Sequence, residues 1–338
     1  MKEQANILVT GVTGFVGAAV VNYLLLQNYR VSVISRKPTN LSTPNMDVLL
    51  VGDLEKLCEP ESPVVAEVAE KLRDIDVVVH CAGLAHNLNP ANSVEPFYKL
   101  NRDVTAALAG LAAQGGVKRF VFISTIGVNG NETRSHLNQN LPEYFAETDL
   151  PNPQNDYARS KSEAEEALWA VNKSTGMEIT IIRPPLIYGA KAKGNFALLK
   201  KVVDKNIPLP FASINNLRSF VALDNLVDFI GVCLMHPNAA DQVFLIADGE
   251  DVSTADLLRQ VAKTSGKRAL LLPFPIGVLA WAAKLLGKQQ LAASLFGSLR
   301  LDTTKARQLL GWRPVVTMQQ QLGKMFSESD GGFPPARE

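Results

Sequence analysis

The sequence predicts an α/β fold in which helices cover both faces of a doubly wound, mostly parallel β-sheet, with a smaller lobe towards the carboxyl terminus. Apolar segments of strand length alternate with amphipathic segments of helix length over the first half of the chain. The early strand candidates are almost wholly apolar and rich in β-branched residues, as strands are when both faces of a parallel sheet are covered. A loop with three glycines follows the first strand candidate directly and opens the first helix candidate.

The strand and helix candidates follow one another in a β-α-β order. Strands are expected at residues 6–9, 30–34, 48–51, 77–80, 119–124, 179–183 and 243–246. Helices are expected at residues 16–27, 64–73, 95–113 and 156–173. With right-handed crossovers this order produces a Rossmann-type sheet, which binds ligands at the carboxyl ends of its strands.

Prolines interrupt this order after residue 183, and we interpret the rest mostly as a smaller substrate-binding lobe. The segment around residues 218–246 is expected to return to the sheet. We therefore expect a Rossmann domain and a lobe made, respectively, of residues 1–185 with 215–248 and of residues 186–214 with 249–330.

Residues 269–283 are the most apolar stretch of the chain. This stretch is too short to span a bilayer, and Pro273 and Pro275 interrupt it. We favour a core helix or a subunit contact over a helix resting on a membrane surface, because a strongly basic polar face is lacking.

Composition narrows the class of protein. The 338 residues are 46% hydrophobic and 20% charged, which allows a sizeable core without metals or disulfides. With a formal net charge of only +1, the chain has no strong positive field to attract nucleic acid or an anionic membrane. The three cysteines and four histidines are scattered, without the spacing of metal ligands. The amino-terminal residues enter a strand pattern without a signal-peptide core, so a metal-free cytoplasmic protein is expected.

Gly11, Gly14 and Gly17 occupy the loop between the first strand candidate and the first helix candidate. A Cβ at Gly11 or Gly14 would obstruct the tight turn and the approach of a pyrophosphate, whereas Gly17 lets the helix pack closely. Phosphates bound here meet the positive end of the helix and its free N–H groups. In this strand–loop–helix context the glycines predict a dinucleotide site rather than ordinary turns.

The end of the second strand candidate bears on the choice of dinucleotide. In NAD-binding Rossmann units an acidic residue here accepts hydrogen bonds from the adenine ribose. This chain has Ser35, Arg36 and Lys37 instead, without a carboxylate. Arg36 suits bidentate binding of a 2′-phosphate, so NADP(H) is predicted over NAD(H); the alternative is a polar loop in solvent. Asp53, after the third strand candidate, suits either the adenine amino group or the cap of the next helix.

Tyr157 and Lys161 lie four residues apart at the start of a predicted helix, and therefore on one face of it. Asn155 and Asp156 precede them and are able to cap the helix. A nearby ammonium and the positive helix end lower the pKa of a phenol, which then exchanges a proton with a carbinol or carbonyl oxygen at about pH 7. Thr125, at the carboxyl end of the fifth strand candidate, is placed to hydrogen-bond the same oxygen. The alternative is a half-exposed surface pair.

These motifs together resemble a known family. The glycine loop and the pair Tyr157/Lys161 are joined by further segments, which are His80-Cys81-Ala82-Gly83, Asn101, Ser124-Thr125 and residues 183–189 (RPPLIYG). The whole set resembles the extended short-chain dehydrogenase/reductases. Within them it is similar to the nucleotide-sugar epimerase/dehydratase group, over nearly the whole length of the chain.

The resemblance implies roles for individual residues. Tyr157 would be the acid/base, and Lys161 would tune it and hold the nicotinamide ribose. Thr125, in preference to its neighbour Ser124, would be the catalytic hydroxyl. His80 would be structural. The implied cofactor-binding residues are Gly11, Gly14, Phe15, Val16, Gly17, Ser35, Arg36, Asp53, Leu54, Cys81, Ala82, Gly83, Asn101, Tyr157, Lys161 and Pro184.

The resemblance also implies a substrate site, with three departures. Asn195 and Arg218 match positions that contact a substrate diphosphate, a surface salt bridge being the alternative for Arg218. Sugar dehydratases have an Asp-Glu pair where this chain has residues 126–127 (Ile-Gly), which argues against dehydration. Many UDP-hexose epimerases have an arginine and an aspartate where residues 292–295 here are Ala-Ala-Ser-Leu, and Arg300 is an open substitute. The third departure is the second-strand end described above.

Two enzymatic hypotheses and one non-enzymatic hypothesis follow. The first is NADPH-dependent reduction of the C4 keto group of a nucleotide-linked sugar, a UDP-4-keto-6-deoxy-hexosamine, for surface-polysaccharide precursors. The alternative is a UDP-hexose or UDP-N-acetylhexosamine 4-epimerase with tightly bound NAD. The NADP prediction favours the reductase. A dinucleotide-binding sensor or scaffold is disfavoured because Tyr157 and Lys161 are both present. By family analogy the chain is expected to be a homodimer.

Overall fold

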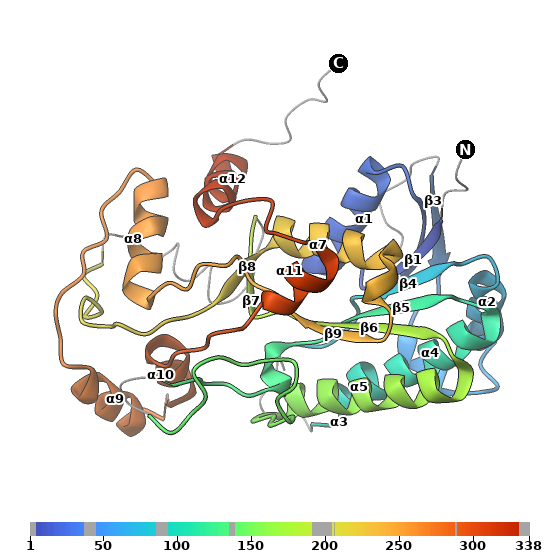
Figure 1. Cartoon of the computed structure of the whole chain (residues 1–338), viewed down its shortest axis with the longest axis horizontal. Helices are drawn as coiled ribbons and strands as arrows, with labels where there is room; N and C mark the ends of the chain where they lie inside the picture. The colour runs from blue at the N-terminus through green and yellow to red at the C-terminus, as the bar shows by residue number, and fades with distance from the viewer. Residues whose placement is uncertain are drawn as a thin grey trace, which may run out of the picture.

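A computed structural model describes residues 5–36, 45–85, 94–134, 139–190, 205, 207–287 and 289–330. Its centre is a seven-stranded sheet in which all neighbouring strands run parallel (Figure 1). The spatial order of the strands is β3-β2-β1-β4-β5-β6-β9. Their bounds are β1 Asn6–Thr10, β2 Arg30–Ser35, β3 Met46–Leu50, β4 Val77–His80, β5 Arg119–Ile123, β6 Glu178–Arg183 and β9 Gln242–Leu245.

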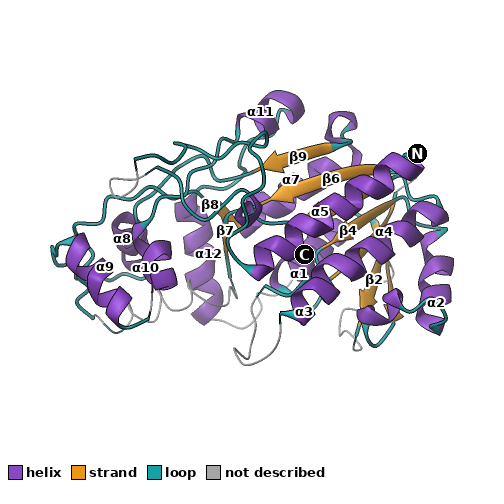
Figure 2. Ribbon diagram, turned by 90° about the horizontal axis from the view of Figure 1, so that it is seen from below, coloured by secondary structure: helices purple, strands orange, loops and turns teal. Residues whose placement is uncertain are grey.

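Helices cover both faces of this sheet (Figure 2). One face carries α1 (Phe15–Leu26) and α7 (Leu223–Met235). The other carries α2 (Pro63–Leu72), α4 (Val104–Gly115) and α5 (Asp156–Thr175). Side chains of β1 alternate between the two resulting cores, with Ile7 and Val9 in one and Leu8 in the other. Burial on both faces explains the almost wholly apolar strands, and the predicted fold class is confirmed.

The predicted helix at residues 95–113 is divided into three parts. These are α3 (Glu95–Tyr98), a π-helical turn η2 (Lys99–Asp103), and α4. Asn101 lies in the π-helical turn, fully buried. Such turns widen a helix by one residue and often occur at functional sites. Local periodicity does not reveal this interruption, since the apolar spacing continues across it.

The carboxyl-terminal lobe is built on a second, two-stranded parallel sheet of β7 (Leu186–Tyr188) and β8 (Phe220–Ala222). Two helices, α8 (Thr254–Thr264) and α12 (Met318–Asp330), pack against it with Leu258 and Leu322 fully buried. Shorter elements complete the described chain: η1 Leu54–Cys58, η3 Ile126–Val128, η4 Pro237–Ala239, α9 Ile276–Leu285, α10 Gln289–Phe296 and α11 Thr304–Leu310.

Two expectations about this half of the chain have different outcomes. The segment around residues 218–246 does return to the main sheet, through β9 at its edge. The stretch 269–283 is not a core helix, because α9 has no buried residue. The exact division into residues 1–185 with 215–248 and residues 186–214 with 249–330 stays a prediction. In the part of the chain that the structure describes, no helix is long and apolar enough to cross a membrane.

Candidate active site

The glycine loop lies at the carboxyl end of β1, close against the end of β4. Gly11 has a φ of +73°, and a Cβ built there would lie 2.6 Å from the backbone nitrogen of Ala82. A Cβ on Gly17 would lie 2.3 Å from the Gly11 carbonyl oxygen, so Gly17 lets α1 pack directly on the loop. Gly14 is the N-cap of α1, and no described side chain caps the N–H groups that follow it. This cradle, which side chains would fill, fits a dinucleotide diphosphate.

The residues at the end of β4 are held by a buried hydrogen-bonded chain. The His80 ring bonds the hydroxyl of Thr10 at 2.7 Å and that of Thr105 at 3.0 Å. The Thr10 hydroxyl also accepts a hydrogen bond from the N–H of Ala82 at 3.2 Å. Burial lowers the pKa of His80 to about 3, so the ring is neutral. His80 is therefore placed as a structural residue that fixes the segment facing the glycine loop.

The ends of β2 and β3 carry the residues predicted to meet the adenosine. Ser35 is buried, and Arg36, which follows it, is exposed. The Asp53 carboxylate accepts a hydrogen bond from the N–H of Glu55 at 3.1 Å and so caps η1, whose first residue, Leu54, is buried. Capping was one of the two alternatives for Asp53, and its contact with adenine stays a prediction. Lys37 lies outside the described residues.

Tyr157 and Thr125 are brought together from α5 and from the end of β5. The Tyr157 phenol is hydrogen-bonded to the Thr125 hydroxyl in a way that lowers the phenol's pKa, and the same hydroxyl accepts from the N–H of Gly127 at 3.1 Å. Asn155 caps α5 as expected, accepting from the N–H of Ala158 at 2.8 Å. A hydroxyl pair at the carboxyl edge of the sheet is therefore positioned by a strand end and by a helix start.

The electrostatics of Tyr157 and Lys161 differ from the expectation that the ammonium lowers the pKa of the phenol. Burial raises the pKa of Tyr157 to about 12, opposed only by its hydrogen bond with Thr125. The Lys161 ammonium instead donates to the carbonyl of Ile123 at 2.9 Å and lies 4.3 Å from the centre of the Phe122 ring. Burial lowers the pKa of Lys161 to about 8. At neutral pH both groups keep their protons, and the ammonium is engaged by β5.

Asn101 links the segment after β4 to α5. Its side-chain oxygen accepts from the N–H of Leu84 at 2.7 Å, and its amide donates to the Leu84 carbonyl at 3.0 Å and to the Ser160 hydroxyl at 2.9 Å. A Cβ on Gly83 would lie 3.0 Å from the Asn101 oxygen and 3.2 Å from the Lys161 nitrogen. The supporting role implied for Asn101 thus has a concrete form, and its contact with cofactor stays a prediction.

A buried charge pair that sequence reasoning missed lies beneath this site. Arg183, at the end of β6, donates from Nε to the Glu165 carboxylate at 3.0 Å and from Nη1 to Asn129 at 2.9 Å. The Ser124 hydroxyl donates to the same carboxylate. The backbone is tied as well, since the N–H of Ile126 donates to the Pro184 carbonyl at 3.0 Å. The available signal was that Glu165 follows Lys161 by four residues on α5.

Of the two predicted substrate residues, the structure describes Arg218. Arg218 is partly buried and donates to the Gly297 carbonyl at 2.9 Å. Burial lowers its pKa to about 10, opposed by Glu132, so it remains a cation. No salt bridge of Arg218 is seen within the described residues. Asn195 lies outside them.

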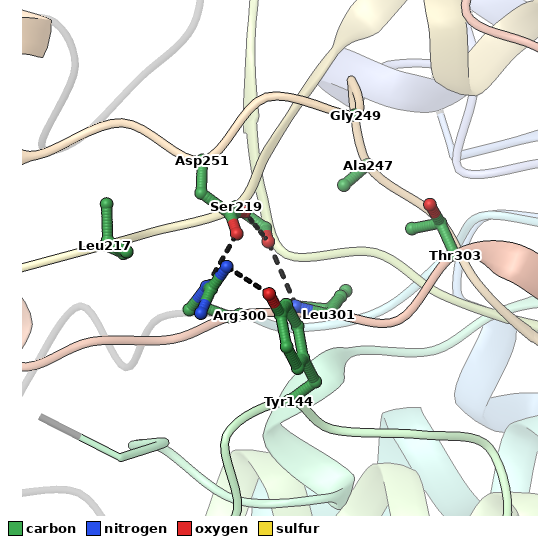
Figure 3. A pocket seen from close by; sticks show the side chains of 9 residues that line it. All are labelled: Tyr144, Leu217, Ser219, Ala247, Gly249, Asp251, Arg300, Leu301 and Thr303. Atoms are coloured by element: carbon green, nitrogen blue, oxygen red, sulfur yellow. Dashed lines mark hydrogen bonds and ion pairs between the residues drawn. The ribbon is translucent and has the colours of Figure 1, made fainter.

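Arg300 lies in a separate polar pocket of about 360 Å³ (Figure 3). Its guanidinium donates to Asp251 at 2.8 Å and to Glu143 at 3.1 Å, and it stacks on Tyr144 with 4.0 Å to the ring centre. The residues lining the pocket do not include Thr125 or Tyr157. Two carboxylates already engage Arg300, so it is not arranged as a substitute diphosphate ligand.

A dinucleotide cradle beside a tyrosine–threonine pair on a doubly wound parallel sheet defines an enzyme of the extended short-chain dehydrogenase/reductase type. The sequence model of the NAD dependent epimerase/dehydratase family matches residues 7–247. The chain belongs to this family, which confirms the resemblance drawn from its motifs.

Known proteins agree with this assignment. The chain is 42% identical to a UDP-glucose 4-epimerase of Vibrio cholerae, covering 94% of each sequence. Among solved structures it is similar to UDP-glucose 4-epimerase with UDP-glucose from Thermotoga maritima, with a TM-score of 0.73, 22% identity and coverage of 96% of this chain and 100% of that one. UDP-glucuronic acid 4-epimerase from Bacillus cereus in complex with NAD has a TM-score of 0.74, 23% identity and 95% coverage of both chains. The two structures support the fold.

Proposed function

We propose that this chain is a 4-epimerase of a UDP-hexose or UDP-N-acetylhexosamine that uses tightly bound NAD. The observation that carries the proposal is the 42% identity, over 94% of both chains, to a protein named UDP-glucose 4-epimerase. This identity favours the epimerase over the reductase, which the residues at the end of the second strand had favoured. The Ile126-Gly127 sequence, in place of the acid pair of dehydratases, agrees with both candidates.

The residues of the site have distinct tasks in this proposal. The glycine loop and the amino end of α1 hold the dinucleotide diphosphate. A bound nicotinamide dinucleotide supplies a reversible hydride acceptor for C4 of the sugar. Tyr157, hydrogen-bonded to Thr125, exchanges a proton with the C4 oxygen. The phenol takes the C4 hydroxyl proton only in its deprotonated form, and it returns that same proton when the C4 oxygen is protonated again. Arg218 and Asn195 hold the substrate diphosphate.

A second candidate is supported by one specific observation. The end of β2 has the exposed Arg36 and a buried Ser35, with no carboxylate at either place. Such an end suits a 2′-phosphate and hence NADPH. With NADPH as donor, the same Tyr157 would protonate the C4 oxygen of a UDP-4-keto-6-deoxy-hexosamine during its reduction, a step for surface-polysaccharide precursors. For either candidate we expect, by family analogy, a homodimer formed through the helices that follow β4 and β5.

The two candidates differ in whether cofactor is consumed. Purified protein is incubated with UDP-glucose or UDP-N-acetylglucosamine without added cofactor, and the products are followed by NMR. The dinucleotide that co-purifies is released by acid and identified. We expect the C4 epimers to interconvert, NAD to be released, and the Tyr157→Phe variant to be inactive. Absence of interconversion, with stoichiometric oxidation of NADPH by a 4-keto sugar nucleotide, would establish the reductase instead.

A further inference from the structure

Helix α9 has two apolar faces, and only one of them is packed. Its residues Ile276, Leu279 and Ala283 are partly buried, and the helix packs against α10. Val278, Trp281 and Leu285 follow the i, i+3, i+7 spacing of a single stripe, and Trp281 is 63% exposed and Leu285 67% exposed. The outer stripe is therefore a bare apolar surface on a helix that is held in place from behind.

The bare surface continues into the segment before α9. Leu270, Leu272 and Phe274 are also exposed, as is Leu286 at the end of the helix. This segment is anchored, since the N–H of Leu272 donates to the Leu209 carbonyl at 2.8 Å. Together, seven of the seventeen large apolar side chains exposed in the described residues lie in residues 270–286. We call this surface the α9 patch.

The segment of chain that carries the α9 patch has charged side chains of one sign only. Residues 257–301 contain no aspartate or glutamate, but they contain seven lysines and arginines. Because the whole chain has a formal net charge of only +1, the remainder of the chain is net acidic. Two of the seven, Arg259 and Arg300, pair with carboxylates. Arg268, in the segment before α9, and Lys284, on α9 itself, add positive charge beside the exposed apolar stripe.

We propose that the α9 patch docks reversibly on an anionic lipid surface. A ten-residue helix is about 15 Å long, half of the roughly 30 Å of a bilayer core, so it would lie in the interface and not cross it. An exposed tryptophan, leucines and flanking cations are the features by which interfacial helices bind anionic membranes. A second copy is disfavoured as occupant, since two such faces would bring like charges together.

The location of the patch allows this contact. In Figure 1 α9 lies at the end of the molecule opposite β3, and in Figure 2 it lies at the end opposite β2. A membrane at that end meets the lobe first and leaves the far edge of the sheet away from it. Residues 269–283 themselves lack a basic polar face, but Arg268 and Lys284 lie directly on either side of that stretch and supply the positive charge. The proposal does not depend on which sugar or dinucleotide the enzyme uses.

Flotation of the full-length protein with vesicles tests the proposal. The vesicles contain equal parts of phosphatidylethanolamine and phosphatidylglycerol, or phosphatidylcholine alone. We expect binding to the anionic vesicles that weakens with salt, and little binding to the neutral ones. The Trp281→Ser/Leu285→Ser variant should lower the partition coefficient about tenfold or more, and Lys284→Gln about fivefold.

Matched variants separate docking from unfolding and from self-association. Leu26→Ser and Leu150→Ser remove exposed leucines outside the patch and should bind as wild type does. Circular dichroism melts check that all variants fold. Equal binding to neutral vesicles, or unchanged binding of the Trp281→Ser/Leu285→Ser variant, overturns the proposal. It is also overturned if light scattering shows a dimer that this variant dissociates while the wild type fails to float.

Discussion

The strands at the centre of the sheet are buried on both faces, whereas α9 in the lobe is bare along one whole face. Ile7, Leu8 and Val9 of β1 are each fully buried, on alternate sides of the sheet. In the lobe, α8 and α12 bury one face against a two-stranded sheet, and α9 has no fully buried residue. Burial on both faces of the sheet holds the catalytic groups in fixed positions. Incomplete burial of α9 leaves the lobe with an exposed apolar surface, which we have proposed to bind anionic lipid.

The polar clusters of the two regions differ in the same direction. The Arg183–Glu165 pair beneath the sheet edge has side chains that are 6% and 4% exposed. The Arg300–Asp251 pair of the lobe has side chains that are 18% and 19% exposed. A charge removed from water depends entirely on its partner, whereas a wetter pair has solvent as a replacement. We therefore expect substitutions at the sheet edge or in the substrate site to have larger effects than substitutions of similar residues outside them.

The largest expected effect compares two tyrosines. Tyr157→Phe removes the proton that the site exchanges with substrate, and kcat should fall about 10²- to 10⁴-fold. Tyr144→Phe removes the hydroxyl that bonds Arg300 in the lobe pocket and should leave kcat within a factor of a few. Steady-state rates, together with the dinucleotide affinity of both variants, measure the difference. Comparable losses in the two variants would place the chemistry elsewhere than at Tyr157.

The next effect is on stability and contrasts two ion pairs that both involve α5. Glu165→Ala leaves Arg183 and the Ser124 hydroxyl without their buried partner, so the free energy of unfolding should fall by about 3–5 kcal/mol. Arg159→Ala breaks an exposed pair with Asp156 on the same helix and should cost about 1 kcal/mol or less. Urea unfolding measures both variants. A small loss for Glu165→Ala would mean that water enters to solvate Arg183.

The site shows which features were predictable from sequence and which were not. Tyr157 and Thr125 were found because a motif and a strand end identify them locally. The Glu165–Arg183 pair was missed because its partners are brought together only by the packing of α5 on β6. The position of the Lys161 ammonium, at the Ile123 carbonyl, also depends on tertiary packing. A nearby cation predicts a lowered phenol pKa only when it faces the hydroxyl.

The fold divides in the same way. Strands of the sheet are long enough and apolar enough for their order to be predicted, and their ends shift by only one or two residues. The helix at 95–113 was predicted as continuous, because nothing in its periodicity marks the π-helical turn at Asn101. The stretch 269–283 was interpreted as a core helix or subunit contact, because hydrophobicity alone does not show which apolar residues find a partner.

A third prediction separates two arginines of the lobe. Within the described residues the Arg218 guanidinium donates to the Gly297 carbonyl, whereas that of Arg300 is engaged by two carboxylates. If Arg218 holds the substrate diphosphate, Arg218→Ala should weaken UDP binding by roughly 1.5–3 kcal/mol, about 10- to 150-fold. Arg300→Ala should change UDP affinity little, and neither variant should change dinucleotide affinity. Titration calorimetry with UDP tests this, and unchanged affinity in Arg218→Ala removes it from the site.

The smallest expected effect concerns Arg36, at the opposite edge of the sheet from the lobe. Arg36 is exposed beside the buried Ser35, so its contribution to binding a 2′-phosphate is reduced by solvent. We expect Arg36→Ala to lower NADPH affinity roughly three- to tenfold while leaving NADH affinity unchanged. Arg30→Ala, on the exposed first residue of the same strand, is the matched control and should affect neither cofactor. Fluorescence titrations of the wild type and both variants with each cofactor measure the six affinities.

The outcome at Arg36 also decides between the two proposed reactions. A 4-epimerase has no use for a cofactor that is consumed, whereas a one-way ketone reduction suits NADPH, which cells keep mostly reduced. Tighter NADPH binding in the wild type, lost selectively in Arg36→Ala, would strengthen the reductase despite the 42% identity to a UDP-glucose 4-epimerase. Tighter NADH binding, with no selective loss in the variant, means that Arg36 points to solvent. The missing carboxylate at the end of β2 would then not determine the dinucleotide, and the cofactor preference would agree with the epimerase.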